Sequence, residues 1–187
     1  FDFLAVATQH MVGRKLNAKK TQQFYTRDMF TQGKVDEYTE AVKREITARL
    51  DLIKTYRDWL PIIDLLSTLM LLRYNGYRME LQSTYDAVDS AFRNWSASHY
   101  GSLASTADIN QPVMLHHVPD YIRRSSTKPA VIVIDGMSFV DWQQIREYFA
   151  DAPWSVTINA AFSFLPSVTS IARQSLFSGK VPSQNSK

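Results

Sequence analysis

Residues 129–136 constrain the fold more than any other segment, because they join an apolar run to a carboxylate. Residues 131–134 read Val-Ile-Val-Ile. An uninterrupted β-branched run of this kind is typical of a strand covered on both faces of a parallel sheet. The run is followed at once by Asp135 and Gly136. We therefore predict a buried strand whose carboxyl end carries a carboxylate.

The residues after this strand follow the pattern of an α/β domain. Ser138 and Asp141 have the spacing of a helix capping box, and Gly179 has the position of a helix C-terminal stop. The predicted elements are a helix over 138–150, a second strand over 154–162, a turn over 165–169 and a short helix over 170–178. Strand, helix, strand, turn and helix in this order predict a βαβα unit, the first part of a doubly wound parallel sheet.

The preceding part of the chain has helical periodicity instead. Apolar residues recur at three- and four-residue steps from Val35 to Tyr56, and Asn75-Gly76 has the form of a helix stop. Three helices are predicted, over about 35–57, 62–74 and 77–96. Residues 1–33 give a mixed pattern. We predict a mainly helical region over 1–97.

Residues 98–128 separate the two patterns. They are mostly small and polar and contain Pro112 and Pro119, which is typical of a linker or an insertion. A short helix is predicted near 118–124. The predicted organisation is therefore a helical region over 1–97, a linker over 98–128, and an α/β part over 129–187.

The composition narrows the classes of protein. The chain has 187 residues, a net charge of +3 and no cysteine, which excludes disulfides, thiolate zinc sites and cysteine nucleophiles. The most apolar stretch, residues 59–72, is interrupted by polar residues and is too short to span a bilayer comfortably. We expect a cytoplasmic protein without a membrane segment. Because the chain starts at Phe1 and stops just after a predicted helix, we interpret it as a piece of a larger protein.

Asp135 is the first candidate site residue. Ligands of open parallel sheets bind beyond the carboxyl ends of the strands. A carboxylate there, followed by a glycine that admits a ligand, suits a metal ion. A helix cap or a turn explains Asp135 equally well, and the segment alone leaves both interpretations open.

Thr169 is the second candidate, and Arg173 accompanies it. Thr169 is predicted to lie at a helix N-terminus, where the helix dipole and free N–H groups favour anionic oxygen. A metal-bound hydroxyl at such a place is a competent nucleophile towards phosphorus. Arg173 lies four residues further on the same helical face and could bind a phosphate oxygen. The simpler interpretations are an N-cap at Thr169 or Ser170 and a solvated arginine at 173.

Other candidate motifs carry less chemistry. The adjacent His116 and His117 cannot place both side chains on one face of a strand or helix, and we interpret both as surface residues of the linker. The basic residues 14–20 are interpreted as a solvated face, with nucleic-acid binding as the alternative. No dinucleotide-binding glycine motif, P-loop, nucleophile elbow or zinc-protease motif occurs.

Taken together, the motifs resemble the alkaline-phosphatase superfamily, and within it the PglZ-domain proteins of BREX-type phage defence. The matching pattern is an apolar strand ending in Asp-Gly at 135–136, a Pro-Ser-Val-Thr turn at 166–169, and a small-residue helix ending in Ser-Gly-Lys-Val-Pro at 178–182. The resemblance covers about residues 129–182. The sulfatase motif of the same superfamily is absent, which favours phosphate over sulfate esters.

The resemblance implies a function and a site. It implies a metal-dependent phosphatase or phosphodiesterase with two divalent ions, expected to be zinc, in which Asp135 is a metal ligand and Thr169 is both nucleophile and metal contact. Phosphate esters or nucleic acid are the implied substrates, and other defence proteins the implied partners. Such enzymes complete the metal site with aspartates and histidines downstream of the nucleophile, so we expect this piece alone to be inactive. The alternatives are a non-catalytic helical module with a degenerate phosphatase-like core that binds proteins or DNA, and a PglZ domain of a signalling protein.

Overall fold

The computed structural model describes residues 5–8, 31–125, 128–149 and 156–182. The chain divides into two compact units. One comprises residues 1–9, 95–139 and 156–187, and the other residues 10–94 and 140–155. The basic residues 14–20 and the first residues of the predicted second strand lie outside the described residues. Each unit is described by itself below.

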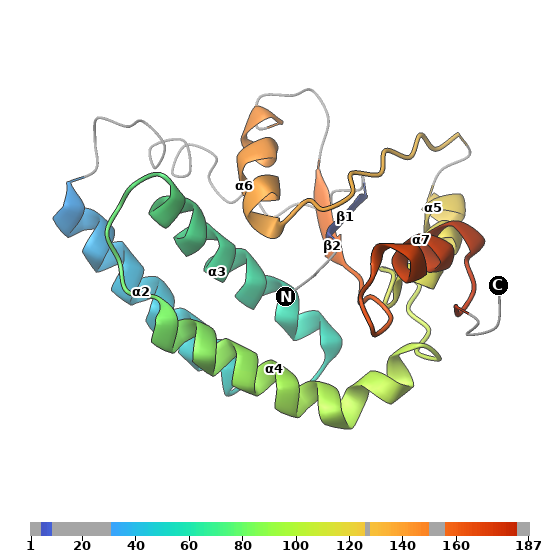
Figure 1. Ribbon diagram of the computed structural model, residues 1–187, viewed down its shortest axis with the longest axis horizontal. Helices are drawn as coiled ribbons and strands as arrows, with labels where there is room; N and C mark the ends of the chain where they lie inside the picture. Colours follow the sequence, from blue (N-terminus) through green and yellow to red (C-terminus); the bar gives the residue numbers. More distant parts are fainter. Residues whose placement is uncertain (1–4, 9–30, 126–127, 150–155, 183–187) are drawn as a thin grey trace. The chain divides into compact units, whose positions relative to one another are not determined.

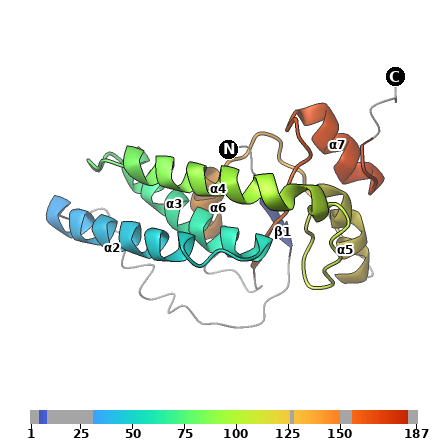
Figure 2. The same ribbon diagram turned by 90° about the horizontal axis from the view of Figure 1, so that it is seen from below.

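The unit formed by 10–94 and 140–155 is helical where it is described. Helices α2 (Gln32–Leu50), α3 (Trp59–Tyr74) and the first part of α4 (Gln82–Leu103) run alongside one another in Figures 1 and 2. The buried positions of α2 are Val35, Thr39, Val42 and Ile46, which recur every three or four residues on one helical face. The predicted helical periodicity is confirmed, but the helix ends at Leu50 rather than near residue 57.

The start and the end of α3 follow from local sequence. A 3-10 turn, η1 (Tyr56–Asp58), precedes it, with Thr55 and Asp58 forming a capping box. At the other end Asn75 is the C-cap, and Gly76 has a positive φ of 96°. Few residues other than glycine adopt that angle. The predicted helix stop at Asn75-Gly76 is therefore confirmed.

Helix α6 (Phe139–Tyr148) packs onto α3 through polar side chains. Gln143 is fully buried, and its Nε2 donates to Asp64 Oδ1 at 2.7 Å and to Ser67 Oγ at 2.9 Å. Arg146 Nη1 donates to the same Asp64 oxygen at 2.9 Å. A buried N–H group is costly unless it donates a hydrogen bond, so these contacts of Nε2 hold α6 on α3, although the buried Oε1 of Gln143 has no hydrogen-bond partner in the described structure. The helix itself was predicted over 138–150.

The other unit contains a small sheet. Strand β1 (Ala5–Thr8) pairs with β2 (Thr157–Ala160) in antiparallel register, with Ala5 opposite Ala160. An isolated parallel bridge joins Met114 to Phe162 just beyond β2. The remaining elements are η2 (Leu115–His117), α5 (Val118–Ser125) and α7 (Thr169–Ser178). Gly179 closes α7 with φ of 65°, as predicted.

The core of this unit is formed where we had predicted a linker. Val113, Met114, Leu115 and Val118 are at most 1% exposed. Leu115 and Val118 pack with Ala161 and Ala172, and the partly buried Ile122 and Leu176 lie against them. The residues of 98–128 are thus partly core, although the short helix near 118–124 is confirmed as α5.

The predicted parallel sheet is not found among the described residues. Residues 131–134 form no strand there, and their side chains are 41–87% exposed. The second predicted strand exists as β2, but its neighbour is antiparallel. The described part of the chain is mainly helical, which agrees with the predicted helical region, whereas the predicted α/β sheet is not seen among the described residues. The physical reason is that a strand requires a ladder partner, and a residue pattern cannot supply one. No described helix has the length and apolarity needed to cross a bilayer.

Candidate functional site

Helix α7 carries Thr169 and Arg173 on its exposed face. Ala172 and Ser175 face inward and are 7% and 0% exposed, whereas Thr169 and Arg173 are exposed. Residues four apart on a helix are neighbours on its surface. The packing of α7 against η2 and α5 therefore presents a hydroxyl and a guanidinium side by side to solvent.

The N-terminus of α7 has no side-chain cap. Its N-cap is Val168, which has extended backbone angles, and no side chain accepts from the first-turn amides. The N-cap interpretation of Thr169 and Ser170 is therefore wrong. Thr169 is the first helical residue, so the helix begins one residue before its predicted start at Ser170. The amides of the first turn lack intrahelical acceptors, which favours an anion beside the Thr169 hydroxyl.

Asp135 lies in a turn after residues 131–134. It does not cap α6, which begins four residues later at Phe139, so the helix-cap interpretation is wrong and the turn interpretation holds. The turn continues into Gly136, whose φ is 72°. Arg173 Nη2 donates to Asp135 Oδ2 at 2.7 Å. The structure thus brings Asp135 together with Arg173, on the helix that begins with Thr169.

These groups do not by themselves fit a divalent metal. Within the described ranges, no group of three histidine, cysteine, aspartate or glutamate side chains is arranged to hold a metal ion. The donors at this place are one carboxylate, already engaged by Arg173 through Oδ2, and one hydroxyl. Structural and catalytic metal sites use three or four protein ligands. No chemical step of the described residues is therefore assigned to a metal.

The two adjacent histidines are not the surface residues that we had predicted. His116 is 8% exposed, and its Nδ1 has no hydrogen-bond partner. Burial lowers the pKa of His116, and the nearby His117 lowers it further. His117 Nδ1 accepts from the Met114 amide, so its Nε2 is the nitrogen that donates to the Ala104 carbonyl. Both rings are therefore parts of the packing rather than metal ligands.

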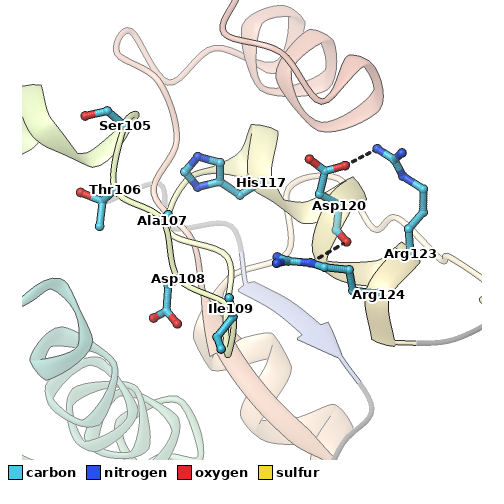
Figure 3. Close-up of a pocket in the computed structure, with 9 residues that line it drawn as sticks. All are labelled: Ser105, Thr106, Ala107, Asp108, Ile109, His117, Asp120, Arg123 and Arg124. Atoms are coloured by element: carbon cyan, nitrogen blue, oxygen red, sulfur yellow. Dashed lines mark hydrogen bonds and ion pairs between the residues drawn. The ribbon is translucent and has the colours of Figure 1, made fainter.

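A hollow beside α5 contains charges that the sequence did not single out. Its volume is about 410 Å³, and it lies between α5 and residues 105–109 (Figure 3). Asp120 pairs with Arg123, and its carbonyl accepts from Arg124 Nε at 3.3 Å. In Figure 3 the guanidinium of Arg124 extends towards the 107–109 loop. The acidic and basic groups here neutralise one another, so the hollow has no marked preference for an anion.

Comparison with known proteins concerns the C-terminal part of the chain. Residues 113–187 match the family model described as the BREX system PglZ alkaline phosphatase-like domain. No curated protein and no solved structure matches the chain. The matched segment begins at Val113, in a run of buried residues, and upstream of the predicted boundary at 129. It includes Asp135, Thr169 and Arg173.

Proposed function

Because residues 113–187 carry a PglZ-domain segment, we propose that this protein is part of a metal-dependent phosphatase or phosphodiesterase that acts in bacterial phage defence. The observation that carries the proposal is the contact between Asp135 and Arg173 at 2.7 Å, on the helix that begins with Thr169. It gathers a carboxylate, a guanidinium and a hydroxyl from segments 38 residues apart.

Thr169 is the proposed nucleophile. Its hydroxyl oxygen would attack phosphorus, the ester oxygen would leave, and the resulting phosphothreonine would be hydrolysed by water. The first-turn amides of α7 would donate to the phosphoryl oxygens as negative charge develops on them. Asp135 and Thr169 would be two of the ligands of the expected zinc ions, together with groups other than those described. A zinc ion there would supply positive charge to the phosphoryl group.

The cellular setting belongs to the same proposal. We infer a cytoplasmic protein that acts on phosphate esters or nucleic acid and associates with other defence proteins. The support is the BREX description of the matched family. Activity assays should use the intact protein, because the described residues do not complete a metal site.

The test is hydrolysis of p-nitrophenyl phosphate and bis(p-nitrophenyl) phosphate by the intact protein. Thr169→Ala removes the attacking oxygen, so we expect kcat/KM to fall by on the order of 10³-fold or more. Thr47→Ala is the matched control, because Thr47 is an exposed helical threonine that only donates to the Lys43 carbonyl. Circular dichroism should show both variants folded. Full activity of Thr169→Ala would refute the assignment.

A second candidate is a non-catalytic interaction module with a degenerate phosphatase-like core. It is favoured by the lack of three metal-ligand side chains in one place among the described residues. The two functions differ in metal content. Stoichiometric zinc in the purified intact protein, with loss of hydrolysis on chelation, supports the enzyme. No bound metal and no hydrolysis of either substrate supports the module.

A further inference from the structure

We propose that Arg173 is a positioning residue that holds Asp135 against α7, rather than a residue that binds phosphate. This inference rests on the proposed function for the roles of Asp135 and Thr169. The contact itself is independent of them: Arg173 Nη2 donates to Asp135 Oδ2 at 2.7 Å across 38 residues.

The backbone around Asp135 does not fix its position. Residues 131–134 form no strand and are exposed on both faces, with Ile132 87% exposed. In the part of the chain that the structure describes, no backbone hydrogen bond involves these residues. Gly136 follows with a φ of 72°, and glycine restricts the backbone less than any other residue. A carboxylate on such a segment needs a side-chain contact to keep one location.

Arg173, in contrast, stands on an anchored helix. Its chain neighbour Ala172 is in the core with Leu115 and Val118, and Ser175 is fully buried. Gly179 at the end of α7 lies against Pro119, since a Cβ at Gly179 would be 3.7 Å from the Pro119 ring. Arg173 therefore offers a fixed point, one helical turn from Thr169, to which the carboxylate of Asp135 is bound.

The charges favour this role over phosphate binding. A guanidinium donating to a carboxylate makes a charge-assisted hydrogen bond, and the carboxylate neutralises its charge. An anionic substrate would have to compete with Asp135 for the same donor. The side chains of Arg173 and Asp135 are 59% and 45% exposed, so the pair shifts the population of the held state by no more than about five-fold.

The first experiment measures the position of the segment without any activity. The chain has no cysteine, so Ile132→Cys and Phe177→Cys create two exposed sites for nitroxide labels. Electron–electron distance measurements on the 187-residue chain should give one dominant distance. Arg173→Gln should broaden the distribution and lower that population several-fold, and Arg173→Lys should partly restore it. Arg93→Gln is the matched control, because it removes another exposed ion pair, with Asp89. An unchanged distribution in Arg173→Gln overturns the proposal.

The second experiment separates positioning from phosphate binding in the intact protein. A positioning role predicts that Arg173→Gln lowers kcat about five-fold with little change in KM, whereas a phosphate-binding role predicts a raised KM. A raised KM with unchanged kcat overturns the proposal. If the proposed function itself is wrong, Thr169→Ala would remain active, whatever the distances between the labels. If Thr169→Ala is inactive and the labels do not respond to Arg173→Gln, only the positioning role fails.

Discussion

Leu115→Ala tests whether residues 113–118 are core or linker. Leu115 is fully buried, and it packs with Val118, Ala161 and Ala172. Its amide also donates to the carbonyl of Phe162 at 3.0 Å, two residues beyond the end of β2. The substitution removes the side chain beyond Cβ and leaves this backbone contact unchanged.

The magnitude follows from the atoms removed. Leucine to alanine deletes three carbon atoms, and a buried methylene contributes about 0.8 kcal/mol, which gives roughly 2 kcal/mol for transfer alone. The cavity left behind adds to this, because the neighbours relax only in part, and fully buried leucines cost about 2–5 kcal/mol. We expect a loss of about 3 kcal/mol in the free energy of unfolding.

The assay is urea unfolding of the 187-residue chain followed by circular dichroism at 222 nm. The matched control is Leu52→Ala, since Leu52 is 68% exposed, and we expect it to stay within about 0.5 kcal/mol of the parent. Equal effects of the two substitutions would refute the reasoning. Such a result would restore the linker interpretation of residues 98–128.

Two further predictions concern polar groups, the buried His116 and the partly exposed Asp64 that contacts buried Gln143. The lowered pKa of His116 means that the folded state binds fewer protons than the unfolded state, whose pKa is near 6.5. The free energy of unfolding should therefore fall as the pH drops below about 6.5, by at most about 1.4 kcal/mol per pH unit. His116→Gln should flatten that part of a urea-unfolding series between pH 8 and pH 5, and an unchanged slope would contradict the assignment. Asp64→Ala removes the acceptor shared by Gln143 and Arg146 and should cost about 1–3 kcal/mol. Asp89→Ala, at an exposed pair, should cost less than about 1 kcal/mol in the same assay, and equal losses would contradict a specific role for the contact of Asp64 with buried Gln143.

The local signals in the sequence predicted the helices well. Asn75-Gly76 ends α3, and Gly179 ends α7. Both glycines have a positive φ, and this backbone conformation can be predicted from the presence of glycine alone. Helical periodicity is equally local, since it needs only neighbours three and four residues away. The position of Thr169 at the start of α7 was predictable for this reason.

The pairings between distant segments were not predictable. β1 joins β2 across about 150 residues, and nothing in the four residues of β1 identifies that partner. The burial of His116 was not predicted, because the prediction considered only that two adjacent side chains point to different faces of a strand or helix. A better signal was the apolar density around them: Val113 to Leu115 before the pair and Val118 after it. The contact of Asp135 with Arg173 also depends on tertiary structure.

The exposed run at 131–134 combines a local sequence pattern with a dependence on pairing to a distant segment. Four β-branched side chains are 41–87% exposed here, and burial of each such side chain contributes about 1.5–3 kcal/mol. The total is comparable with the whole stability of a typical domain, so this segment has a strong tendency to enter a sheet once neighbouring strands are present. The pattern predicts this tendency rather than a strand. Because Asp135 directly follows this run, its position depends on whether residues 131–134 pair with neighbouring strands. While they are unpaired, the contact with Arg173 holds Asp135 against the helix that begins with Thr169.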